Sequence, residues 1–316
     1  MPMAASFKEC TMSKKVVLVT GSSSGFGRLI SQALARANHK VYASMRDVNG
    51  KNAANAQQIF DLSLAESLDI QPLELDVQSQ SSVDQAVNTI IDECGVIDIV
   101  VHNAGHMMFG PAEAFTPEQF ALQYDVNVLG TQRLNRAALP FMRMRREGYL
   151  IWISSSSSAG GTPPYLAPYF AAKAAMDSLA VQYARELSRW GIESTIVVPG
   201  AFTKGTNHFA HAGCPEDVER LDEYESGPYG NFREIVKESF AQIVPENAQP
   251  DPVADMVVDA VSKPFGDKPF RLHFDTTEDG ADLGFAVLDR LRAEMLRRVG
   301  LADLLTPRNW APLCTR

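Results

Sequence analysis

The chain has 316 residues, of which 45% are hydrophobic and 21% charged, a composition typical of an ordinary globular protein. Its 38 acidic against 29 basic residues give a formal net charge of −9, which argues against binding to nucleic acid or to an anionic membrane surface. Four scattered cysteines without C-x-x-C spacing predict free thiols and no metal site. No apolar stretch approaches the roughly 18 residues of a membrane span and the N-terminus is polar, so we expect a cytoplasmic protein.

Short apolar segments alternate with amphipathic ones along the chain. We expect strands at residues 15–20, 40–45, 72–76, 97–102, 149–154 and 193–198, and a final edge strand at 270–274. We expect helices at residues 26–37, 49–68, 81–94 (capped by Ser81 or Ser82), 120–145, 169–189 and 283–299. Strands that are apolar on both faces and separated by helices predict an α/β fold, a Rossmann-like doubly wound parallel sheet flanked by helices.

One stretch, residues 202–251, interrupts this alternation. It holds five aromatic side chains among Gly, Pro and acidic residues, namely Phe202, Phe209, Tyr224, Tyr229 and Phe232. A long irregular insertion in a compact domain is typical of a lid. We therefore predict a flexible N-terminal tail at 1–13, one Rossmann-like domain at 14–275 with a substrate lid at about 202–251, and a C-terminal helical extension at 276–316.

A glycine-rich turn, Gly21-Ser22-Ser23-Ser24-Gly25-Phe26-Gly27, joins the first predicted strand to the first helix. Glycines let the backbone turn tightly and approach a pyrophosphate, which then lies at the amides and the positive dipole end of the helix. Such turns also occur for packing reasons alone. Their position between a strand and a helix, however, indicates a dinucleotide cofactor.

Tyr169 and Lys173 are four residues apart in a predicted helix, so their side chains lie on one face. An ammonium near a phenol favours the phenolate and lowers the pKa of the tyrosine, which suits a general acid or base for a carbonyl or alcohol oxygen. Alone, the pair is typical of an ordinary helix surface. The serines at 154–158 follow a predicted buried strand, and they offer hydroxyls that could bind the same substrate oxygen.

In combination these features resemble the short-chain dehydrogenase/reductase family in its single-domain form. The motifs that carry the resemblance are, in chain order, Thr20-Gly21-x-x-x-Gly25-x-Gly27, Asp76-Val77, Asn103-Ala104-Gly105, Asn127, the serines at 154–158, Tyr169-x-x-x-Lys173, and Pro199-Gly200 with Thr203. The run Ser44-Met45-Arg46-Asp47 and the extended C-terminus are similar to hydroxysteroid and retinol dehydrogenases. The resemblance implies an oxidoreductase of the carbonyl reductase type.

The resemblance also implies a role for each matching residue. Tyr169 would exchange a proton with the substrate oxygen, Lys173 would hold the nicotinamide ribose, and Asn127 would anchor a water of a proton relay. Asp76 and Val77 would border the adenine, and Thr203 would hold the nicotinamide carboxamide. The full set of cofactor-binding residues implied is Gly21, Ser23, Ser24, Gly25, Phe26, Gly27, Arg46, Asp76, Val77, Asn103, Ala104, Gly105, Tyr169, Lys173, Pro199, Gly200 and Thr203.

The catalytic serine is Ser155 or Ser156. Counting forward along the strand from Gly148 places the family position on Ser155, whereas counting back from Tyr169 places it on Ser156. We favour Ser156, because the distance to the tyrosine reflects function.

The residue at the end of the second strand indicates which cofactor is bound. NAD-specific enzymes carry a carboxylate there that binds both ribose hydroxyls. This chain has Met45 followed by Arg46, so no charge repels a 2′-phosphate and a guanidinium can pair with it. Ser22 and Ser23 could add hydroxyl donors. We predict NADP(H), with NAD the weaker candidate.

The predicted function is an NADP(H)-dependent oxidoreductase that moves a hydride between nicotinamide and a hydrophobic ketone, aldehyde or secondary alcohol. Met107, Met108 and Phe109, with the lid aromatics, indicate an apolar substrate pocket. The alternative is a non-catalytic NADP-binding regulator or sensor of the same fold. The family resemblance also implies a homodimer or homotetramer formed through helices 120–145 and 169–189.

Overall fold

The computed structural model describes residues 13–206 and 211–308. The predicted N-terminal tail therefore lies almost wholly outside the described residues, as do Phe209 and the last eight residues of the chain. Within the described ranges, no helix combines the length and apolar character needed to cross a membrane.

Seven strands form one parallel sheet in the order β3-β2-β1-β4-β5-β6-β7. They are β1 (Val16–Val19), β2 (Lys40–Met45), β3 (Ile70–Glu74), β4 (Ile99–His102), β5 (Gly148–Ile153), β6 (Ile192–Pro199) and β7 (Arg271–Phe274). The predicted doubly wound fold is confirmed, and β7 is the edge strand. The strand order reverses between β1 and β4, and ligands of open parallel sheets bind at such a switch point, beyond the carboxyl ends of the strands.

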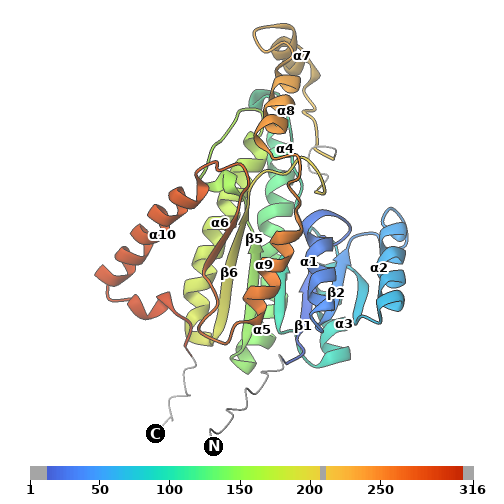
Figure 1. Cartoon of the computed structure of the whole chain (residues 1–316), viewed down its shortest axis with the longest axis vertical. Coiled ribbons are helices and arrows are strands. Elements are labelled where there is room, and N and C mark those ends of the chain that lie inside the picture. The colour runs from blue at the N-terminus through green and yellow to red at the C-terminus, as the bar shows by residue number, and fades with distance from the viewer. Residues whose placement is uncertain (1–12, 207–210, 309–316) are drawn as a thin grey trace, which may run out of the picture.

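Helices cover both faces of the sheet (Figure 1). They are α1 (Gly25–Arg36), α2 (Ala53–Glu66), α3 (Gln80–Cys94), α4 (Pro117–Tyr124), α5 (Gly130–Arg145), α6 (Ala167–Leu187), α7 (Val218–Ser226), α8 (Phe232–Ile243), α9 (Asp251–Ser262) and α10 (Ala281–Arg298). Neighbouring residues of β1 point to opposite faces: Leu18 packs in a core with α3, α5 and α6, whereas Val17 and Val19 pack in a core with α1, α2 and α9.

Two predicted helices begin or divide differently in the structure. Helix α3 begins at Gln80 and is capped by Ser79, whose hydroxyl accepts the amide of Ser82 at 3.3 Å, so the predicted cap at Ser81 or Ser82 was wrong. The predicted helix 120–145 is three segments: α4, a π-helical turn over Asp125–Leu129, and α5. A capping box between Thr116 and Gln119 starts α4 earlier than hydrophobic periodicity indicated.

The segment predicted as an irregular lid contains two helices, α7 and α8, so the expectation of irregular structure was wrong. Helix α8 is amphipathic, and its Phe232, Val236 and Phe240 pack on Met107 and Leu166 of the body. Both helices lie at one end of the molecule, beyond the sheet (Figure 1). Helix α10 lies on the far side of α6 from α1 and α2 (Figure 1), and its buried residues, Ala281 and Phe285, are in its first turns.

Candidate active site

The glycine turn after β1 is shaped by tight contacts with β4. Gly21 has φ +68°, a conformation that favours glycine, and a Cβ on Gly27 would overlap both the Gly21 carbonyl and Asn103 Nδ2. Asn103 Nδ2 donates to the carbonyls of Thr20 (2.8 Å) and Gly21 (3.1 Å). The amide of Ala104 donates to Thr20 Oγ1 at 3.0 Å. The ends of β1 and β4 are thus held together at the switch point.

The start of α1 is arranged for an anion. Ser24 is its extended N-cap, yet its side chain accepts no helix amide, and the first turn holds no acidic residue. The amides and the positive dipole end are therefore not neutralised by the helix's own side chains. Ser23 is half-buried and Ser24 exposed. Ser22 is fully buried and donates to the Val19 carbonyl at 3.0 Å, so its expected role as a phosphate donor is wrong.

Beyond β2, Met45 is buried and Arg46 is exposed. The Glu74 carboxylate accepts the amides of Asp47 (2.7 Å) and Val48 (2.8 Å). These contacts hold the backbone that follows Arg46 in place. They also engage the Glu74 carboxylate, at the end of β3, in hydrogen bonds with backbone amides. The Arg46 side chain is exposed beside this loop.

Asp76 and Val77 follow β3 on the same edge of the sheet. Asp76 Oδ1 accepts the amide of Gln78 at 3.0 Å, and Val77 is buried against Gly130, where any larger residue would overlap it. Neither residue lines the large cavity that holds Tyr169 and Lys173.

Tyr169 and Lys173 lie one turn apart on α6, with Lys173 Nζ 6.0 Å from the Tyr169 ring centroid. Burial raises the pKa of Tyr169 to about 12, and a hydrogen bond with Ser155 opposes that shift. Burial lowers the pKa of Lys173 to about 8, and its Nζ donates to the Ile153 carbonyl at 2.8 Å. The expected lowering of the tyrosine pKa is not found in this structure, because burial of the phenol outweighs other influences.

Each serine after β5 has a different partner. Ser155 contacts Tyr169 and also accepts the Ser157 hydroxyl at 2.8 Å. Ser156 begins the 3₁₀ turn Ser156–Ser158, and its carbonyl accepts the amides of Ala159 and Gly160. Ser155 is thus the serine hydrogen-bonded to Tyr169, and both Ser155 and Ser156 line the cavity that holds this tyrosine.

Asn127 lies in the π-helical turn and is completely buried. Its Nδ2 donates to the Gln123 carbonyl at 2.9 Å, whereas its Oδ1 has no hydrogen-bond partner within residues 13–206 and 211–308. That oxygen lies against Gly105. A buried carbonyl oxygen without a donor is the environment that an ordered water satisfies.

The threonine that the family resemblance implies at the nicotinamide, Thr203, does not line the cavity. Thr203 is exposed and does not line the cavity, whereas Thr206 is 6% exposed and does. The Thr206 carbonyl lies over the start of α1, at 3.2 Å from where a Cβ on Gly25 would stand. Of these two threonines, Thr206 is therefore the one placed at the cavity. The sequence carries no signal for this, since both are threonines in a loop after Pro199-Gly200.

One cavity of about 450 Å³ connects these residues to the lid. Its polar end holds Asn103, Gly105, Ser155, Ser156, Tyr169, Lys173, Pro199 and Gly200. Its apolar lining comprises Phe26, Met107, Leu166, Phe170, Phe202, Phe232, Ile235, Val236, Phe240 and Ile243. Sequence reasoning missed Thr277 and Asp279, which lie between β7 and α10 and also line it.

The lid aromatics divide into two groups. Phe202 and Phe232 line the cavity, and Phe202 also packs edge-on against Phe26 at 5.5 Å. Tyr224 and Tyr229 pack on each other at 5.7 Å, and Tyr229 lies 6.1 Å from Tyr165, so they brace the lid instead of lining the cavity. In the part of the chain that the structure describes, no three His, Cys, Asp or Glu side chains come together as a metal site requires.

Comparison with known sequences finds similarity to dehydrogenases and reductases. The family described as short chain dehydrogenase matches residues 15–213. The chain is 31% identical over 290 residues to estradiol 17-beta-dehydrogenase 1 of Rattus norvegicus, covering 90% of this chain and 78% of that protein. It is 34% identical over 194 residues to 3-ketodihydrosphingosine reductase of Bacteroides thetaiotaomicron, covering 61% of this chain and 66% of that protein.

Solved structures agree in fold. A short-chain dehydrogenase from Streptomyces avermitilis superposes with a TM-score of 0.70 at 29% identity, covering 91% of this chain and 98% of its own. A metagenomic short-chain oxidoreductase in complex with NADP superposes with a TM-score of 0.63 at 21% identity, covering 84% and 98%. At that identity the second likeness concerns the fold alone.

Proposed function

The chain belongs to the short-chain dehydrogenase family, and from that premise we propose that it is an NADP(H)-dependent oxidoreductase acting on a hydrophobic ketone, aldehyde or secondary alcohol. One observation carries the proposal: Ser155, Tyr169 and Lys173 meet at the polar end of a cavity whose other walls are apolar. Relatives named for estradiol and for 3-ketodihydrosphingosine support a substrate of this kind.

The residues present fit a dinucleotide. The close packing of Gly27 against Asn103 and Gly21 leaves bare backbone at the start of α1, where a pyrophosphate would meet amides. Arg46 would pair with a 2′-phosphate, and Lys173 would hold the nicotinamide ribose. We assign the carboxamide contact to Thr206, and Asn103 and Gly105 would lie along the cofactor at the cavity's polar end.

When bound, the nicotinamide supplies or accepts the hydride. In reduction, Tyr169 Oη donates a proton to the substrate oxygen, and in oxidation it accepts one. Its raised pKa keeps the phenol protonated at neutral pH, which favours its role as an acid. Ser155 Oγ accepts a hydrogen bond from Ser157, so its own proton, which lies beside Tyr169, can turn to orient and polarise the substrate oxygen once substrate is bound. The unpaired Oδ1 of Asn127 would hold a water on the path that returns the proton to Tyr169.

The alternative, a non-catalytic NADP-binding regulator, requires a fold without a working proton donor. Tyr169, Lys173 and Ser155 are all present and in contact with the cavity, which favours the enzyme. The homo-oligomer and the cytoplasmic location stay predictions from the sequence.

The test is consumption of NADPH at 340 nm with a panel of apolar ketones and aldehydes. We expect turnover, and we expect Tyr169→Phe to lower kcat/KM by about 10²- to 10⁴-fold while NADPH still binds. Tyr183→Phe is the matched control, because Tyr183 lies on the same helix but donates to Gln132 at 2.5 Å, away from the cavity. Binding of NADPH without turnover of any substrate would instead favour the regulator.

A further inference from the structure

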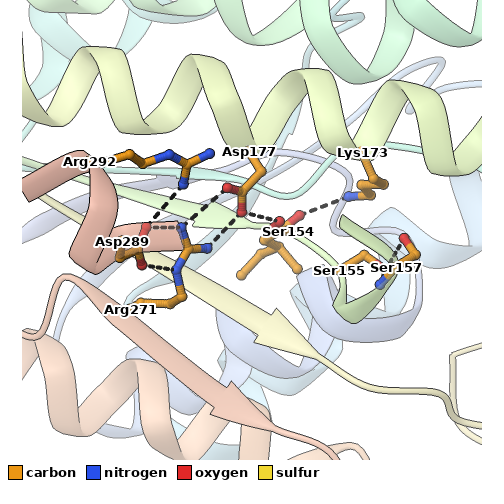
Figure 2. A network of polar contacts seen from close by, with 9 residues as sticks. Ser154, Ser155, Ser157, Lys173, Asp177, Arg271, Asp289 and Arg292 are labelled. Atoms are coloured by element: carbon orange, nitrogen blue, oxygen red, sulfur yellow. Dashed lines mark hydrogen bonds and ion pairs between the residues drawn. The ribbon is translucent and has the colours of Figure 1, made fainter. Parts of the chain in front are cut away.

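A buried network of charges lies one turn beyond the catalytic lysine (Figure 2). Asp177 follows Lys173 by four residues on α6, and its carboxylate accepts Arg271 Nη1 at 2.7 Å and Nη2 at 3.2 Å. The same guanidinium donates to Asp289 of α10 through Nε at 2.7 Å and Nη2 at 3.2 Å. The side chains of Asp177 and Arg271 are 3% and 5% exposed. Arg271 therefore bridges the catalytic helix and the C-terminal helix from the edge strand β7.

The catalytic side of this network reaches the serine turn. Asp177 Oδ2 also accepts the Ser154 hydroxyl at 2.8 Å, and Ser154 stands between Ile153, whose carbonyl holds Lys173 Nζ, and Ser155. Figure 2 shows Lys173 and Asp177 on α6 facing Ser154 at the end of β5, with Arg271 of β7 reaching Asp177 from the other side. The network thus touches the backbone that presents both Lys173 and Ser155.

The other side of the network holds the start of α10. The Arg271 guanidinium lies 3.8 Å from the ring centroid of Phe285, which is 1% exposed. Just before that helix, Asp275 accepts the amides of Thr277 and Asp279, and Asp279 accepts the amide of Ala281, each at 2.9 Å. The segment so ordered, residues 275–281, contributes Thr277 and Asp279 to the cavity wall.

We propose that Arg271 and Asp289 are positioning residues that tie this wall segment, through α10, to the catalytic helix. A planar guanidinium can hold two carboxylates in fixed directions at once, so the distance between α6 and α10 is set by the pair. Arg271 and Asp289 both lie beyond residues 15–213, the part of the chain that matches the family. The tie adds substrate positioning to the cofactor-binding domain, without touching the reacting atoms.

The proposal rests on the proposed reductase function for its kinetic readout only. Asp289→Asn removes the ion pair between Arg271 and α10 and leaves the Arg271–Asp177 pair intact, so that Asp177 keeps its partner. We expect KM for the carbonyl substrate to rise about fivefold, with kcat and KM for NADPH within about twofold, because only the cavity wall is loosened. Asp289→Glu should restore most of the affinity.

A second measurement does not depend on activity. Hydrogen exchange of the segment 275–281 should be at least about tenfold faster in Asp289→Asn than in the wild type. The matched control is Arg297→Gln, which removes an exposed ion pair with Glu294 (3.1 Å) on the same helix and should change neither readout.

The outcomes separate the two proposals. Unchanged exchange in Asp289→Asn, or faster exchange with unchanged KM, overturns the positioning role. Absence of turnover in the wild type overturns the proposed function, and exchange then still decides whether α10 orders the cavity wall.

Discussion

Around the glycine turn, backbone atoms are held by contacts between the ends of adjacent strands, whereas the substrate cavity is walled by side chains from segments far apart in the chain. The glycine turn has no room for adjustment, because it is closely packed around Gly27, Asn103 and Thr20. At the cavity, α8 packs with only one fully buried residue, Val236. The rigid region around the glycine turn suits a ligand that does not vary, whereas the loosely covered walls of the cavity can vary with the substrate. Substitutions of the catalytic groups between these two regions should lower activity most, and substitutions in the lid should lower it least.

After Tyr169→Phe, the largest effect is expected at the serine turn. Ser155→Ala should lower kcat by about 100-fold, since it removes a hydroxyl donor to the substrate oxygen, whereas Ser156→Ala should stay within about threefold. Both variants should bind NADPH as the wild type does. The reverse order of the two effects in steady-state kinetics would return the catalytic role to Ser156.

The next effect concerns the cofactor. Arg46→Glu should lower the ratio of NADPH to NADH turnover by at least about tenfold, because a carboxylate would face the 2′-phosphate. Arg46 is exposed, so the exchange spares the core, whereas Met45 is buried and a charge there would disturb it. Lys51→Glu is the control, an exposed charge reversal five residues along. Equal ratios in all three proteins would remove Arg46 from the cofactor site.

The pH dependence should report the buried amine. Burial lowers the pKa of Lys173 to about 8, so its ammonium form is lost as the pH rises through 8, while Tyr169, with its pKa raised to about 12, keeps its proton. The kcat/KM for reduction should therefore fall about tenfold per pH unit above 8. In Lys173→Arg the guanidinium stays charged, so any remaining activity should not fall in this way above pH 8. If kcat/KM of Lys173→Arg still falls above pH 8, the fall must come from the titration of another group.

The smallest effect is expected in the lid. Phe232→Ala should raise KM for an apolar substrate about fivefold with little change in kcat, because it removes part of the cavity wall. Tyr224→Ala deletes an aromatic ring of the same lid that does not line the cavity, and its KM should stay within about twofold. A large fall in kcat in Phe232→Ala would show that the lid acts on the chemistry and would break the contrast between the two regions.

The same contrast explains what the sequence could predict. The parallel sheet, the glycine turn and the Tyr169–Lys173 pair follow from local patterns, because each motif stands directly after a strand or within one helix. The choice between Ser155 and Ser156 depends on where a short turn begins, which residue types alone do not encode. Thr206, Thr277 and Asp279 reach the cavity only through tertiary packing, and no periodicity in their own segments indicates it.

The π-helical turn over Asp125–Leu129 carries a consequence for how this region tolerates change in length. A π-turn holds one residue more than an α-turn, and each residue rotates a helix by about 100°. Deleting one residue of the turn would let α4 and α5 join as one regular α-helix, so the residues of the turn would take new directions while the two flanking helices keep their phase. Asn127 would then swing away from Gly105, although no residue of the site had been substituted. The buried amide thus owes its direction to the extra residue of the π-helical turn, and a single-codon deletion there should act as an active-site mutation.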